Sequence, residues 1–191
     1  MKAAAVLASL ALAAALAGCG TSPEMRYYTL ASEPAPPGAA AGYSIAVGPV
    51  SVPELVDRPH FVLRGAGNRV EIAEQTRWAA PLKSEIPRVV ADHLARLLGA
   101  QASSAAQRAA GTPDYRVAID VLRFEMSPGS TTVIEAQWTV RPHGGGEAVN
   151  GRTLATEAAG AGDDALVAAQ SRALEALSRD IAAALSGLRK R

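Results

Sequence analysis

Residues 115–140 read YRVAIDVLRFEM, then SPGS, then TTVIEAQWTV, and they are the most informative segment for the fold. Apolar and polar side chains alternate in the first and third parts, and this period of two is typical of half-buried strands. The Ser-Pro-Gly-Ser segment between them is typical of a turn. A second turn at residues 143–146 leads to a weaker run at residues 152–157. The sequence therefore predicts an antiparallel meander of three strands.

The pattern of the first of these strands breaks near its end. Leu122, Phe124 and Met126 are out of phase with Val121. A strand with apolar residues in both phases is typical of one that is covered on both faces. We expect this strand to be buried on both sides.

Further strands are indicated upstream of the meander. Residues 43–52 place Ile45, Val47 and Val50 among small residues, and Pro53 ends this run. Two short runs follow at residues 61–64 and 69–73, with a Gly-Ala-Gly-Asn turn between them.

Two segments have the period of an amphipathic helix. In residues 81–98 apolar side chains recur every three or four positions, and Gly99 is typical of a helix end. Pro87 lacks a backbone donor, so this helix either begins near Glu85 or is kinked. A second helix begins near Asp163 and continues to the C-terminus, with Asp163 and Asp164 suited to its N-terminal end. The prediction is an α/β domain with a mixed, mostly antiparallel sheet of about five strands and two long amphipathic helices.

The first 19 residues have the pattern of an export signal. Lys2 precedes an uncharged stretch, residues 3–16, that is too short to span a bilayer but suits a secretory signal peptide. Leu16-Ala17-Gly18-Cys19 resembles a bacterial lipobox, which predicts cleavage between Gly18 and Cys19 and acyl chains on Cys19. The alternative is an ordinary signal peptide cut near Ala17, with Cys19 left as a free thiol. Cys19 is the only cysteine, and lipidation would consume that unpaired thiol. More than one acyl chain anchors a protein to a membrane without spanning it.

These signals divide the chain into three parts. Residues 1–18 are the predicted signal peptide, residues 19–42 a lipidated cysteine with a Pro/Ala-rich tether, and residues 43–191 a single α/β domain. Residues 27–30 are prone to form a strand. They either belong to the tether or add an edge strand to the domain.

Composition and motifs exclude several functions. Nineteen basic and 18 acidic residues give a net charge of +1, so nothing suggests a nucleic-acid partner. His60, His93 and His143 lack metal-ligand spacing, and a lipidated cysteine cannot act as a nucleophile. We interpret His93 as a core or boundary residue and His143 as exposed. The sequence predicts a protein that is not an enzyme and holds no cofactor or metal.

A proline-bounded loop is the candidate partner site. Residues 53–59 read PELVDRP, and the two prolines hold the loop stiff, which lowers the entropic cost of binding. Glu54, Asp57 and Arg58 are the predicted docking residues, although such a charge cluster also occurs in ordinary solvated turns. Trp78 either belongs to this surface or packs the helix against the sheet.

The order of these motifs resembles the PqiC family, which comprises auxiliary lipoproteins of MCE-type ABC transport systems. The residues that carry the resemblance are the lipobox, the segment YYTL at 27–30, IAVGPV at 45–50, PELVDRP at 53–59, and Glu74 with RWAAPL at 77–82. The resemblance covers nearly all of the mature chain. It implies a three-layer α/β domain similar to the anticodon-binding-domain-like fold.

The resemblance also implies a role and a place in the cell. It implies an outer-membrane lipoprotein that faces the periplasm and docks an MCE protein of an ABC transporter, which moves lipids between the two membranes. Gly20, in place of an aspartate, agrees with outer-membrane sorting. A homo-oligomeric ring is a further expectation, since MCE proteins form rings. The alternatives are an envelope assembly lipoprotein and a small-lipid carrier that acts without an MCE partner.

Overall fold

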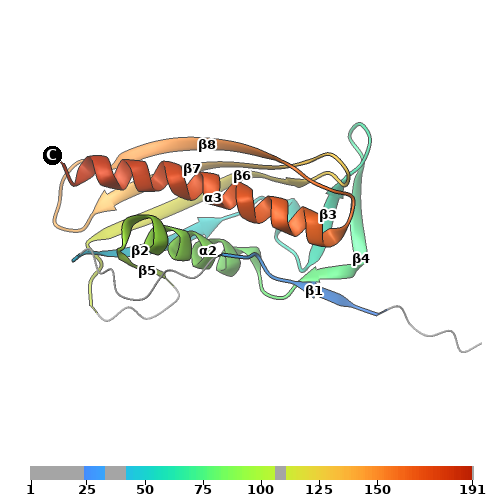
Figure 1. Cartoon of the computed structure of the whole chain (residues 1–191), viewed down its shortest axis with the longest axis horizontal. Coiled ribbons are helices and arrows are strands. Elements are labelled where there is room, and N and C mark those ends of the chain that lie inside the picture. Colours follow the sequence, from blue (N-terminus) through green and yellow to red (C-terminus); the bar gives the residue numbers. More distant parts are fainter. Residues whose placement is uncertain (1–23, 33–41, 106–110, 191) are drawn as a thin grey trace, which may run out of the picture.

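The computed structural model describes residues 24–32, 42–105 and 111–190 (Figure 1). The predicted signal peptide, Cys19 and most of the predicted tether lie outside these residues. Within them, no helix combines the length and the apolar character needed to cross a membrane. The elements in chain order are β1 Arg26–Tyr28, β2 Ser44–Ser51, the short 3-10 helix η1 Glu54–Val56, β3 His60–Arg64, β4 Val70–Trp78, α2 Leu82–Leu98, β5 Gln101–Ser104, β6 Tyr115–Met126, β7 Thr131–Pro142, β8 Val149–Ala158 and α3 Asp163–Leu188.

The predicted meander forms the long part of the sheet. Strands β6, β7 and β8 pair antiparallel along nearly their whole length. The other edge of β6 is shared by two branches. Its first half pairs parallel with β2, which pairs parallel with β5, and its end meets β3 at a single position, Leu63 opposite Met126. Strand β3 pairs antiparallel with β4, and β4 pairs parallel with the edge strand β1.

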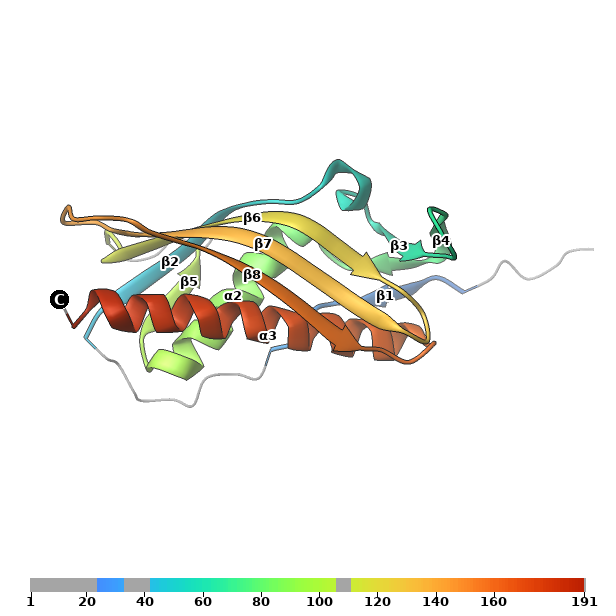
Figure 2. The same cartoon turned by 90° about the horizontal axis from the view of Figure 1, so that it is seen from above.

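Both helices pack on the same face of this sheet (Figures 1 and 2). Helix α3 lies against β7 and β8, α2 lies against β2 and β5, and the two helices contact each other. Polar side chains such as Glu135, Arg141 and Arg152 occupy the opposite face of the meander. One sheet face is therefore open.

The predicted α/β class with a mixed sheet and two long helices is confirmed. The sheet contains eight strands instead of about five. Strand β5 has too few apolar residues to be recognised from the sequence, and an edge strand at residues 27–30 was only one of two alternatives. The implied third layer is wrong, since the helices share one face.

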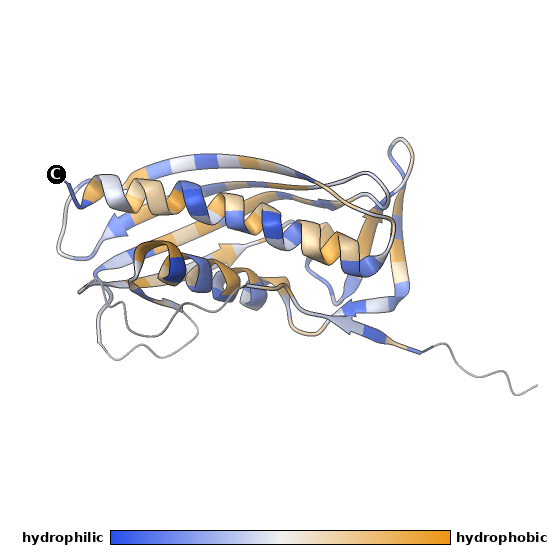
Figure 3. Cartoon of the chain, in the orientation of Figure 1, coloured by the Kyte–Doolittle hydropathy of each residue, from blue (hydrophilic) through white to orange (hydrophobic). Residues whose placement is uncertain are grey.

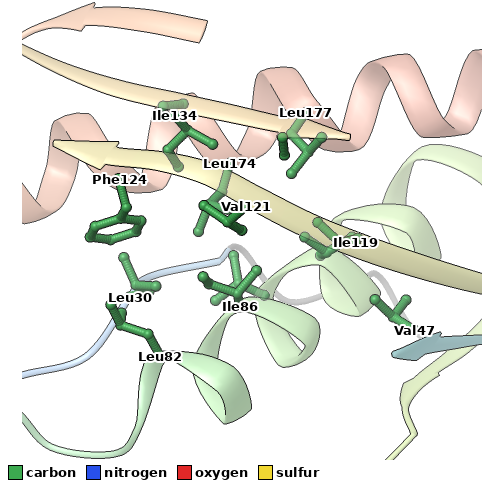
Figure 4. Close-up of a cluster of buried hydrophobic side chains, with 14 of the residues drawn as sticks. Leu30, Val47, Leu82, Ile86, Ile119, Val121, Phe124, Ile134, Leu174 and Leu177 are labelled. Atoms are coloured by element: carbon green, nitrogen blue, oxygen red, sulfur yellow. The ribbon is translucent and has the colours of Figure 1, made fainter. Parts of the chain in front are cut away.

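The core lies between the helix pair and the sheet. Figure 4 shows Ile86 of α2 and Leu174 and Leu177 of α3 directed toward Val121 of β6 and Ile134 of β7. All five side chains are at most 2% exposed. Figure 3 shows the corresponding hydropathy pattern, with polar and apolar residues interleaved along the helices and the meander strands.

A β-bulge explains the break in the pattern of β6. The pairing with β7 shifts between Val121 and Arg123, and the extra residue reverses the phase of the strand. Phe124 and Met126 therefore point into the same core as Val121, while Leu122 remains 38% exposed. The expectation that this strand is covered on both faces is wrong.

Helix α2 runs from Leu82 to Leu98 and ends at Gly99, which has a positive φ of 62°. The alternative start near Glu85 is wrong, because the backbone N–H groups of Ser84 and Glu85 already bond to the carbonyl of Pro81. Pro87 lies inside the helix on its buried side.

Residues 26–30, which lie within the predicted tether, belong to the domain. Strand β1 pairs with β4, and Arg26 forms an ion pair with Asp163 at 2.9 Å. Leu30 is only 1% exposed. Residues 27–30 therefore join the domain as an edge strand and its extension and are not part of a free tether.

Candidate docking surface

The loop at residues 53–59 stands on the open face of the sheet. It connects β2 to β3 at the point where the two branches separate, and in Figure 2 it rises on the side opposite α2 and α3. Because both flanking strands belong to the sheet, the base of the loop is fixed at two places.

Backbone hydrogen bonds hold this loop in one shape. The N–H groups of Val56 and Asp57 donate to the carbonyl of Pro53 at 3.0 and 3.1 Å, which closes the η1 turn. The side chain of Val56 is buried. At the other end, the N–H of Trp78 donates to the carbonyl of Pro59 at 2.7 Å. The stiffness expected from the two prolines is therefore reinforced by contacts with the domain.

The three predicted docking residues have different surroundings. Glu54 is exposed in the η1 turn. Asp57 forms an ion pair with Lys83 of α2 at 2.6 Å. Arg58 is half-buried and, with Asp57 and Trp78, lines a cavity of about 320 Å³ beside the start of α2. Glu54 is thus exposed, Asp57 is paired with α2 and Arg58 is half-buried, so the three residues do not share one environment.

A cavity lies between the loop and β6. It has a volume of about 320 Å³, and its apolar lining includes Leu55 and Val56 of the loop and Leu122 and Phe124 of β6, while Arg64, Arg123 and Glu125 also line it. Leu55 is 44% exposed and Leu122 is 38% exposed. Two large apolar side chains thus remain accessible at one opening, which we call the loop cavity.

A row of charged side chains crosses the open face beside the loop cavity. Its members, which we call the arginine row, are Arg64, Glu125, Arg123, Glu135 and Arg152, from β3, β6, β7 and β8. The closest partners on β3 and β6 are Arg64 and Glu125 at 2.7 Å, and Arg123 binds the same carboxylate at 2.9 Å. The arginine side chains are 37–61% exposed, whereas the glutamates are 10–19% exposed. The row therefore presents guanidinium groups to the solvent and keeps its carboxylates underneath.

These contacts keep the row charged. The hydrogen bond from Arg123 holds the pKa of Glu125 below its ordinary value, and burial opposes this effect. The same hydrogen bond raises the pKa of Arg123. Both groups are therefore ionised throughout the neutral range.

The histidines and Trp78 have structural surroundings. His93 is 3% exposed, and its Nδ1 lies 3.2 Å from Oγ of Ser178 on α3. His60 begins β3, and His143 lies exposed in the turn after β7. Trp78 is 4% exposed, and its ring centroid lies 4.3 Å from that of Phe61, so the packing interpretation of Trp78 is confirmed. The described part of the chain contains no cluster of His, Cys, Asp or Glu residues that could hold a metal ion.

Two polar residues of α2 fasten the N-terminal segment to the domain. The Glu85 carboxylate accepts a hydrogen bond from the N–H of Leu30 at 3.1 Å, and Arg88 donates to the carbonyl of Leu30 at 2.8 Å. Arg88 and Glu85 also form an ion pair at 3.0 Å. The proposed acylation and cleavage residues, Cys19 and Gly18, lie outside the described residues.

The sequence alone does not reveal the loop cavity or the arginine row. The break in period at Leu122 is the mark of the bulge that turns this side chain outward, but the same break is also typical of a strand covered on both faces. Arg123 and Arg152 occupy the polar phase of their strands, but their common row depends on cross-strand register. That register is only visible once the strands are paired.

A comparison with known protein families assigns the chain to a family. The chain matches the family described as ABC-type transport auxiliary lipoprotein component over residues 28–182. The chain therefore belongs to this family. The family consists of membrane-anchored transport accessories and is not a family of enzymes. No curated protein matches the chain.

Two crystal structures are similar to the whole domain. One is an uncharacterized protein, with a TM-score of 0.71 and 19% identity, covering 85% of this chain and 99% of the other. The second is a Xanthomonas campestris protein of the DUF330 family, with a TM-score of 0.60 and 20% identity, covering 81% of this chain and 91% of the other. At these identities the similarity shows the fold alone.

Proposed function

We propose that this lipoprotein sits in the outer membrane, faces the periplasm, and docks an MCE protein of the ABC transport system that it serves. The system would move lipids between the inner and outer membranes and so support envelope integrity. Family membership supports a role as an auxiliary component of ABC-type transport. The order of motifs at residues 16–82, which resembles the PqiC family, supports the assignment to an MCE system and to the outer membrane.

One observation carries the docking role. Within the described residues one face of the sheet carries no helix, and on that side the exposed Leu55 and Leu122 border the loop cavity. Large apolar side chains that gather at an opening on a soluble domain mark interaction sites. A stiff loop beside them reduces the ordering cost of an association.

The anchor sets the distance between this surface and the bilayer. The chain from Cys19 to Arg26 spans at most about 25 Å when fully extended. Arg26 is tied to Asp163, and Leu30 is held by Glu85 and Arg88. With acyl chains on Cys19, the end of the domain where β1 enters would lie close to the membrane.

The small-lipid carrier receives less support. A carrier needs an apolar cavity between helices and sheet. Where the helices meet the meander, that space is filled by Ile134, Leu174 and Leu177, which are all 0% exposed. The described cavities at this surface open to the outside instead.

Affinity purification from membranes tests the proposed function. A C-terminally tagged wild-type chain, after labelling with palmitate, should incorporate label, float with outer-membrane fractions and co-purify with an MCE subunit. A Cys19→Ala chain should lose the label and the membrane association. An unlabelled wild-type chain that is free in the periplasm would contradict the anchor.

A Leu55→Glu chain separates docking from anchoring. It should keep the label and membrane fraction but lose most of the co-purified MCE subunit. The control is Leu97→Glu, since Leu97 is 37% exposed on α2, on the helix side of the sheet. Equal recovery of the MCE subunit with Leu55→Glu and wild type would contradict docking at the loop cavity. A labelled chain that recovers only other envelope proteins would favour the assembly lipoprotein.

A further inference from the structure

Two arginines face each other across the open side of the meander. Arg116 of β6 and Arg141 of β7 are direct partners in the antiparallel pairing, and both are exposed. Side chains at such positions have Cβ atoms about 4.5–5.5 Å apart, and like charges there destabilise a sheet. The sequence thus accepts a repulsive pair at a site where nearly any polar residue would fit.

This repulsion is not relieved inside the domain. Neither Arg116 nor Arg141 forms an ion pair or a side-chain hydrogen bond with any described residue, that is, with residues 24–32, 42–105 and 111–190. Each guanidinium has five N–H donors and no acceptor. The pair therefore offers an unused, concentrated set of donors to an anionic ligand.

The pair is continuous with the arginine row. Along β7, Arg141 shares its phase with Thr139, Gln137 and Glu135, and Glu135 belongs to the row. The distance from Glu135 to Arg141 is about 20 Å along the strand. Between them the surface is hollowed beside Ala118 and Thr139, with a volume of about 330 Å³.

The charges on this face favour a negative ligand. The arginine row and the pair contribute Arg64, Arg116, Arg123, Arg141 and Arg152, against Asp120, Glu125 and Glu135. Glu125 and Glu135 lie beneath arginines, and Asp120 accepts a hydrogen bond from Ser51. The acidic groups are thus occupied, while guanidinium groups point outward at both ends.

The position of the pair distinguishes a protein ligand from a membrane surface. β6 runs from Arg116 at one end of the molecule to the end where β1 enters the domain (Figure 2). The N-terminal anchor would hold that second end near the bilayer, so the arginine pair lies at the end directed away from it. The anionic groups that meet the pair should therefore come from a protein in the periplasm.

We propose that the open sheet face, from the Arg116–Arg141 pair to the arginine row, binds an acidic segment of a partner protein whose apolar side chain enters the loop cavity. Carboxylates bind arginine through charge-assisted hydrogen bonds, often two at a time. The apolar residue would contact Leu55 and Leu122. This proposal rests on the docking role above and adds the chemistry of the partner.

Fluorescence anisotropy tests the proposal with the full chain purified in detergent. The probes are a short fluorescein-labelled Glu-rich peptide with two leucines and the same peptide with every Glu replaced by Gln. Wild type should bind only the Glu peptide. R116S/R141S should bind it about tenfold more weakly, with a smaller dependence on salt. R116K/R141K should restore part of the affinity, because it keeps the charge but not the bidentate geometry.

The control R69S/R172S removes the same charge from two exposed arginines elsewhere and should bind like wild type. Equal affinity of R116S/R141S and wild type would overturn the proposal. Tighter binding of wild type to phosphatidylglycerol vesicles than to the Glu peptide, lost in R116S/R141S, would assign the surface to lipid headgroups and also overturn it.

Stability separates binding from a structural role. Because R116S/R141S removes a like-charge repulsion, its melting temperature should equal or exceed that of wild type. A lower melting temperature would show that the arginines hold the sheet and would count against the proposal. If the peptide binds as expected while membranes yield no MCE subunit, the proposed function fails and this inference stands.

Discussion

The carboxylate of Glu85 accepts a hydrogen bond from the backbone N–H of Leu30 at 3.1 Å, across 55 positions of the chain. Glu85 is 6% exposed, and Arg88 neutralises its charge while binding the carbonyl of Leu30. Both backbone polar groups of Leu30 are therefore bound by α2. This arrangement joins the segment nearest the proposed anchor to the core of the domain.

We expect Glu85→Ala to destabilise the domain by about 1–3 kcal/mol, because it leaves the buried N–H of Leu30 without an acceptor. Glu85→Gln keeps an acceptor and should cost less. Urea unfolding followed by circular dichroism measures both changes. Glu71→Ala, on the exposed side of β4, is the control and should stay within about 0.5 kcal/mol of wild type. Equal stability of Glu85→Ala and wild type would show that this attachment contributes nothing.

A second prediction concerns the contact between β7 and β8. Gly151 lies opposite Trp138, and a Cβ at Gly151 would come within 2.1 Å of the indole ring. Trp138 cannot move freely, since its Nε1 donates to Thr153 at 3.1 Å. We expect Gly151→Ala to cost about 3 kcal/mol through overpacking. Gly144→Ala, in the turn before β8 with nothing within 4 Å, should be nearly neutral in the same thermal unfolding experiment. A melting temperature of Gly151→Ala equal to that of Gly144→Ala would contradict this packing.

The third prediction is a pH dependence that originates at His93. Oγ of Ser178 donates to the carbonyl of Leu174 at 2.8 Å, so Nδ1 of His93 carries the hydrogen in the bond between the two side chains. Burial lowers the pKa of His93 from its ordinary value of 6.5. Nearby Glu175 and Asp92 raise it and Arg96 and Arg179 lower it, with burial the largest influence.

The unfolded chain therefore binds the proton on His93 more tightly than the folded chain. The contribution of His93 to stability is complete above pH 6.5 and is lost as the pH falls through the folded pKa. Urea midpoints measured from pH 8 to pH 5 should fall below pH 6.5 in wild type and fall less in His93→Asn. His143→Asn, which changes an exposed histidine, should follow wild type. A steeper fall in His93→Asn than in wild type would contradict this assignment.

The sequence predicted the elements better than their arrangement. Residues 115–140 and both helices were recognisable because their apolar residues recur with the period of buried strands and helices. Strand β5 reads QASS and contains no such pattern, and it exists because β2 offers it an edge. The use of a single sheet face by both helices follows from strand pairing and cannot be obtained from local periodicity.

The docking surface was predictable only in part. The prolines of residues 53–59 marked the loop, and its place on the open face agrees with a role in binding. Leu122 was misassigned because one bulge residue reverses the faces of β6. Arg116 and Arg141 are 25 positions apart in the chain, and their opposition depends on the register of β6 and β7.

We infer that the open sheet face docks a component of the transport system. Site-specific photo-crosslinking in living cells measures this most directly, with the reactive residue at Leu122 on the open face or at Arg172 on the helix side. We expect a crosslink from position 122 to the MCE subunit and none from position 172. Crosslinks to that subunit from position 172 alone, or from neither position in cells that make the complete transport system, would contradict it.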